Sequence, residues 1–78
     1  MTNKEVLTQQ IFELTQYNEL PLILCISGRP IKIDNNDTED IQVIATDNDT
    51  GEVIGIMDED GYFEDVDLQW LDESYDRM

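Results

Sequence analysis

Apolar residues recur at helical spacing near the start of the chain and alternate with polar residues further along it. Leu7 and Ile11 are four positions apart, and further apolar residues continue that spacing, which is typical of one face of a helix. The pattern predicts a helix over residues 3–17. Phe12 and Tyr17 lie within this segment, and we expect both rings to belong to the core.

Both ends of the predicted helix carry recognisable signals. Thr2 and Glu5 have the spacing of a capping box, in which each side chain accepts a hydrogen bond from the other residue's backbone amide. Asn18 can adopt the left-handed conformation that ends many helices, and Pro21 prevents the helix from continuing.

The segments after Pro21 are short, rich in β-branched residues and separated by turn residues, which is typical of antiparallel strands. We expect Gly28-Arg29-Pro30 to connect the first two strands, with Pro30 at the start of the second strand or on an edge. A polar loop over residues 35–38 follows. The expected strands are Leu22–Ser27, Ile31–Ile33, Ile41–Thr46, Val53–Met57 and Tyr62–Val66.

Two acidic turns join the last three strands. They are Asp47-Asn48-Asp49-Thr50-Gly51 and Asp58-Glu59-Asp60-Gly61, and each places a glycine where a left-handed residue closes a hairpin loop. The first turn resembles the start of a calcium loop. An EF-hand needs glycine at the sixth position and glutamate at the twelfth, whereas here glycine comes fifth and Asp58 twelfth. We therefore expect plain hairpin turns and no metal site.

The segment after Val66 fits two structures. Val66, Leu68 and Trp70 alternate as in a strand, whereas Leu68 and Leu71 have helical spacing. A helix capped by Asp67 is the favoured alternative. The elements together predict one small α+β domain over residues 1–78, with the N-terminal helix packed on a four- to five-stranded antiparallel sheet. An open sheet is preferred over a meander closed into a small barrel or roll.

Charge is segregated along the chain, whose formal net charge is −15. Residues 1–33 carry three basic and three acidic side chains and are neutral overall. Residues 34–78 carry 16 acidic side chains against Arg77 alone, so this half holds the whole net charge. Such asymmetry indicates that one part of the molecule binds a partner. The sign excludes direct binding of nucleic acid, which needs basic residues to neutralise phosphates.

The residue types of most enzymes are missing. The chain has no histidine to activate Ser27, Ser74 or Cys25 as a nucleophile, and Cys25 lies in the most apolar strand, where we expect an inert core thiol. Its four glycines do not have the spacing of a phosphate-binding loop. We expect a protein that is not an enzyme and uses no cofactor.

The sequence favours the cytoplasm. A single cysteine cannot form an internal disulfide, and the N-terminus lacks the apolar stretch of a signal peptide. The longest apolar run, Leu20–Ile26, is far shorter than the roughly 20 residues of a membrane span. An anionic membrane surface would repel the acidic half.

In size and charge, residues 34–78 resemble the small acidic inhibitors that phages direct against host nucleases, restriction enzymes, CRISPR effectors or uracil-DNA glycosylase. The resemblance is one of composition and includes no motif. It implies a DNA or RNA mimic acting in the cytoplasm of the host cell, which binds a basic nucleic-acid-binding protein. The expected contact residues are Asp47, Asp49, Asp58, Glu59, Asp60, Tyr62, Glu64, Asp65, Asp67, Trp70, Asp72 and Glu73.

Other hypotheses compete with mimicry. An antidote or immunity-type protein would neutralise a basic toxin at a site other than its nucleic-acid groove. An acidic accessory or structural subunit would use its charge for solubility only. A second copy of the chain is a further candidate partner. Trp70 is either part of the core or an anchor for the partner, because interfaces favour tryptophan and a small core also needs large residues.

Overall fold

The structure, a computed structural model, describes residues 1–35 and 43–76 and begins with the predicted helix. Helix α1 spans Asn3–Tyr17, and the capping box of Thr2 and Glu5 is present in both directions. At the other end, Asn18 has an extended backbone with φ −130°, so the expected left-handed cap is wrong. Its backbone and side-chain N–H groups instead donate to the carbonyl of Leu14, which satisfies one free end of the helix without a left-handed residue.

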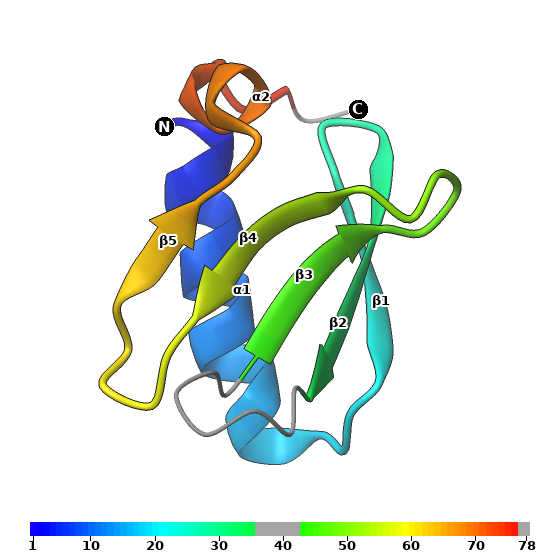
Figure 1. Cartoon of the computed structure of the whole chain (residues 1–78), viewed down its shortest axis with the longest axis vertical. Coiled ribbons are helices and arrows are strands. Elements are labelled where there is room, and N and C mark those ends of the chain that lie inside the picture. Colours follow the sequence, from blue (N-terminus) through cyan, green and yellow to red (C-terminus); the bar gives the residue numbers. More distant parts are fainter. Residues whose placement is uncertain (36–42, 77–78) are drawn as a thin grey trace.

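Five antiparallel strands form one sheet in the order β1-β2-β3-β4-β5, which confirms the predicted α+β fold with an open meander. The sheet curves around α1, which lies along one of its faces (Figure 1). Residues 36–42, which include most of the predicted loop and the start of the predicted strand 41–46, lie outside the described residues. The strands are β1 Leu22–Ile26, β2 Arg29–Asn35, β3 Val43–Asp47, β4 Val53–Met57 and β5 Phe63–Asp65.

The turn between β1 and β2 is tighter than expected. Ile26 pairs with Arg29, so the connection consists of Ser27 and Gly28 alone, with φ values of 51° and 75°. Two successive positive φ values are those of a type I′ turn, whose twist matches that of the flanking strands. Arg29 and Pro30 therefore belong to β2, and Pro30 is at the start of that strand as predicted.

Side chains alternate between the two faces of the sheet, and one face forms the core with α1. Within β1, Ile26 is buried whereas Cys25 is exposed, so the expectation of a core thiol is wrong. The physical reason is the two-residue period of a strand, which directs neighbouring side chains to opposite faces even in an apolar segment. The buried apolar core consists of Leu7, Ile11, Ile26, Ile31, Ile33, Val43, Ala45, Ile54, Met57, Phe63 and Leu71.

Two aromatic residues of α1 lie outside the core, contrary to expectation. Phe12 is 65% exposed and Tyr17 is 83% exposed. Each residue of a helix is rotated by about 100° from the one before, so Phe12 points well away from the face that Leu7 and Ile11 bury. Tyr17 is the last residue of the helix, and the buried residues of α1 are Asn3, Leu7 and Ile11 nearer its start.

In the hairpin of β4 and β5, the ring of Phe63 packs directly against the backbone of Gly55. A Cβ atom at Gly55 would overlap the ring of Phe63. Phe63 pairs with Met57, which is two residues after Gly55 on the same strand. The ring therefore covers the glycine backbone closely. This contact fixes the position of β5, which is a short edge strand of three residues.

A short second helix joins the end of the chain to its beginning. Helix α2 spans Leu68–Asp72 with Asp67 as its cap, so the helical alternative is confirmed. The buried side chain of Asn3 donates to the carbonyl of Trp70 and accepts from the hydroxyl of Ser27. The two ends of the chain and α2 consequently lie together at one end of the molecule (Figure 1). Neither α1 nor α2, the helices of the described part, is long and apolar enough to cross a membrane.

Candidate partner-binding surface

The predicted contact residues are distributed over both ends of β4. Asp47 is the last residue of β3, and Asp49 lies in the β3–β4 turn that follows it, at one end of β4. Asp58 to Tyr62 form the β4–β5 turn at the other end. Five residues at about 3.3 Å each separate these turns by roughly 16 Å. Asp67 to Glu73 lie at the end of the molecule where the chain begins, with α2 beside the start of α1 (Figure 1). Arg29 connects Asp67 to Asp47. The structure therefore does not gather the predicted residues on one compact patch.

Arg29 joins three segments near the β3–β4 turn, and Asp47 and Asp67 are its main partners. Its guanidinium group donates to Asp47 at 2.5 Å and to Asp67 at 2.9 Å. It also lies 5.1 Å from the centre of the Trp70 ring, within the range of a cation–π contact. We call these four residues the Arg29 network. Trp70 packs against the core beside this cation, so it is partly buried rather than a fully exposed anchor.

Asp47 is 8% exposed, and both of its carboxylate oxygens accept hydrogen bonds within the fold. One oxygen accepts from Arg29, and the other accepts from the backbone N–H groups of Asp49 and Thr50, which closes the turn. The Arg29 hydrogen bond, followed by the backbone hydrogen bonds, holds the pKa of Asp47 below its usual range. Asp47 therefore acts mainly within the fold and offers little surface to a partner.

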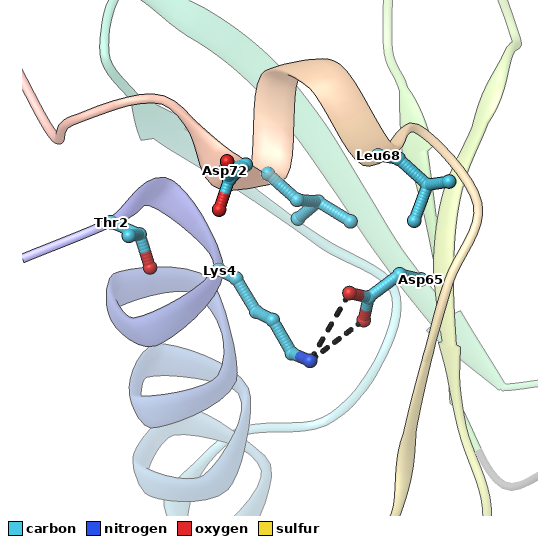
Figure 2. A pocket seen from close by; sticks show the side chains of 6 residues that line it. Thr2, Lys4, Asp65, Leu68 and Asp72 are labelled. Carbon is cyan, nitrogen blue, oxygen red and sulfur yellow. Dashed lines mark hydrogen bonds and ion pairs between the residues drawn. The ribbon is translucent and has the colours of Figure 1, made fainter.

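Asp65 on the edge strand β5 is also paired with a cation. Lys4 of α1 lies 2.9 Å and 3.1 Å from its two carboxylate oxygens, and Figure 2 shows the lysine reaching across to β5. The pair borders a pocket of about 240 Å³ that also includes Leu68 and Asp72. The side chain of Lys4 is 43% exposed and that of Asp65 is 27% exposed, so solvent weakens the pair. The pair positions β5 against α1.

The β4–β5 turn has the same local design but no cation. One oxygen of Asp58 accepts hydrogen bonds from the backbone N–H groups of Asp60 and Tyr62. None of the basic side chains in residues 1–35 and 43–76 forms an ion pair with this turn. The side chains of Glu59 and Asp60 are exposed, and Tyr62 is 74% exposed. This turn therefore presents its carboxylates and an aromatic ring to the solvent.

A groove lies between this turn and α1. Its volume is about 250 Å³, and Phe12 of the helix borders it, as do Glu59 and Asp60 of the turn. Ile11 and Met57 belong to the core and form apolar lining. We call this site the α1–turn groove. It combines an exposed aromatic ring, an apolar surface and two exposed carboxylates.

Phe12 is the groove residue that reasoning from the sequence missed. A helical projection of residues 3–17 contains the signal, because it places Phe12 about 100° from Ile11 and so away from the centre of the buried face. The role of Arg29 had no comparable signal, because its partners Asp47 and Asp67 are 18 and 38 residues away in the chain.

Six of the predicted acidic residues are exposed and form no ion pair with Lys4, Arg29 or Lys32. They are Asp49, Glu59, Asp60, Glu64, Asp72 and Glu73. Over the described ranges, acidic and cysteine side chains do not gather in groups of three or more that could hold a metal ion. The arrangement is suited to contact with a positively charged surface. Comparisons of the chain with models of protein families, with curated proteins and with solved structures return no match.

Proposed function

We propose that this protein is a non-catalytic inhibitor that occupies the basic nucleic-acid-binding surface of another protein, as a DNA or RNA mimic of the phage anti-defence type. One observation carries the proposal. The basic side chains of Lys4, Arg29 and Lys32 each lie within 4 Å of a carboxylate of this chain, while the six predicted acidic residues named above are exposed and pair with none of these three. The exposed charge is therefore dominated by one sign.

The density of this charge supports mimicry rather than solubility alone. The longest dimension of the molecule is 33 Å, and its net charge is −15. Duplex DNA carries about one charge per 1.7 Å, or roughly 19 charges over the same length. A protein that binds nucleic acid through basic residues would meet a comparable charge on this folded surface.

The distribution of the exposed acids also fits an extended partner. Glu59 and Asp60 lie at one end of β4, and Asp49 and Glu73 lie toward the other. A basic groove that follows a nucleic-acid backbone would contact charges at both ends. A toxin antidote that uses one compact site would need only one of them.

Competition with nucleic acid tests the proposal. Immobilised protein is used to capture basic proteins from a bacterial lysate at low salt, and the purified partner is then titrated in the presence of duplex and single-stranded DNA or RNA. We expect nucleic acid to displace the protein, because both occupy one surface. Binding that survives saturating nucleic acid would favour the antidote alternative, and the absence of a basic partner would favour the accessory subunit.

Neutralisation of the six exposed acids measures their joint contribution. Changing all six to Asn or Gln should weaken binding on the order of 100-fold, since exposed charge pairs contribute about 0.5 kcal/mol each. The variant Gln9→Lys with Gln69→Lys is the control, because it adds positive charge at exposed positions and removes no acid. The control changes the net charge by +2 and the neutralised variant by +6. A loss of binding free energy in the control about one third as large as in the neutralised variant would therefore show that net charge matters and the individual acids do not.

A further inference from the structure

The α1–turn groove shares no residue with the Arg29 network. Phe12 at its border is 65% exposed, and Tyr62, which follows the groove residue Gly61 in the chain, is 74% exposed. The Phe12 ring therefore leaves apolar surface at the groove that a bound molecule would cover. The groove therefore offers a hydrophobic contact in addition to charge.

We infer that this groove binds an arginine side chain of the partner protein, an assignment that rests on the proposed function. The aliphatic part of the arginine would lie along the apolar lining that includes Met57, while its guanidinium group would meet the ring of Phe12 and the carboxylates of Glu59 and Asp60. Guanidinium groups stack on aromatic rings and pair with carboxylates in two-bond geometry. Both kinds of group are present at this site.

Size and charge favour a single basic side chain over other occupants. A volume of about 250 Å³ lies below the roughly 300–1,000 Å³ of sites for drug-sized ligands. Two exposed carboxylates at the border would repel an acidic segment, including that of a second copy of this chain. A purely apolar side chain would leave those carboxylates without a partner. Arginine satisfies the apolar and the acidic parts of the site together.

Binding of a small probe to the intact protein tests the assignment by nuclear magnetic resonance. N-acetyl-arginine amide is titrated into the ¹⁵N-labelled protein, with N-acetyl-citrulline amide as the probe of equal shape without charge. We expect saturable chemical-shift changes for the backbone amides of Phe12, Thr15 and Gly61 with the arginine probe. The affinity for the citrulline probe, obtained from the same titration, should be at least about threefold weaker. The amides of α2, at the other end of the molecule, should not shift.

Paired variants separate the groove from general electrostatics. Phe12→Ala should weaken the arginine probe about threefold through loss of the cation–π contact. Tyr17→Ala is its matched control, because Tyr17 is an 83% exposed aromatic residue of the same helix that does not line the groove, and it should leave the affinity unchanged. Glu59→Gln with Asp60→Asn should weaken the probe about fivefold while Asp58 still closes the turn.

Three results would overturn the assignment. They are shifts spread evenly over all exposed acidic residues, equal affinity for arginine and citrulline, and an unchanged affinity after both the Phe12 and the Glu59/Asp60 substitutions. The outcome is independent of the competition assay. If arginine binds in the groove but nucleic acid does not displace the partner, mimicry is wrong and the arginine site stands. If nucleic acid displaces the partner but arginine does not bind in the groove, the arginine site is wrong and mimicry stands.

Discussion

The two acidic turns at the ends of β4 have similar sequences and different surroundings. Each begins with an aspartate that accepts hydrogen bonds from backbone N–H groups of its own turn, and each ends with a glycine at positive φ, 80° for Gly51 and 85° for Gly61. They differ in whether a basic side chain pairs with that aspartate. Arg29 donates to Asp47 in the first turn, whereas the second turn has no such contact with a described basic residue.

This difference separates a structural carboxylate from an available one. The local sequence determines the turn in both cases, since aspartate and glycine satisfy its backbone requirements. A distant residue then determines whether the turn is tied into the fold. The β3–β4 turn is therefore part of the Arg29 network, and the β4–β5 turn borders the α1–turn groove with its charges exposed.

Removal of the cation should give the largest effect. Arg29→Ala removes the cation beside the nearly buried Asp47, which keeps only its two backbone hydrogen bonds, and also removes the contacts to Asp67 and Trp70. We expect the free energy of unfolding to fall by about 3 kcal/mol, because a largely buried carboxylate that loses its cation is costly. Urea denaturation measures the change. Lys32→Ala on the same strand is the control and should cost about 0.5 kcal/mol or less, since its ion pair is 3.8 Å long and half exposed.

Substitution of the two closing glycines should show that the turns are equivalent at the level of the backbone. A Cβ atom at Gly51 or Gly61 would meet no other atom within 4 Å, so the cost arises from positive φ alone. We expect Gly51→Ala and Gly61→Ala each to lower the free energy of unfolding by about 1 kcal/mol. A much larger loss at Gly51, measured in the same urea series, would mean that the Arg29 network also constrains the backbone of its turn.

The smallest effect should appear at acid pH. The folded-state pKa of Asp47 is lowered, mainly by the hydrogen bond from Arg29, so its contribution to stability is complete above the unfolded value near pH 4 and is lost as the pH falls through the folded value. We expect the midpoint temperature to fall as the pH is lowered below about 4, and Asp47→Asn to reduce this slope. Asp58→Asn at the corresponding position is the control. An equal reduction in both variants would contradict the role given to Arg29.

Elements determined by neighbouring residues were predictable from the sequence. The capping box of Thr2 and Glu5 marked the start of α1 correctly, and Asp67 was the correct cap of α2. The two turn glycines also have the predicted conformation. In each case the residues that decide the structure are within five positions of one another, so the pattern contains the physical cause.

Features that depend on direction or on distant contacts were not predicted. Cys25 and Phe12 are apolar residues in apolar surroundings, and only the phase of the strand or helix shows that they face outward. The Arg29 network requires the tertiary structure, because no local pattern relates Arg29 to Asp67. Asp47 was therefore expected at a partner surface although its carboxylate has internal partners.

The hydrogen bonds that Asn3 forms with the end of α2 connect the folding of α1 to the synthesis of later residues. Asn3 is synthesised well before residues 70–76, yet its side-chain amide donates to the carbonyl of Trp70 and its backbone N–H donates to that of Glu73. The carbonyl of Met1 likewise accepts a hydrogen bond from the backbone N–H of Tyr75, at 2.8 Å. Contacts of such long sequence separation form late in folding. The first turn of α1 thus completes its hydrogen bonds only after residues 70–76 have been synthesised, and a nascent chain ending before them would leave the buried amide of Asn3 without its acceptor.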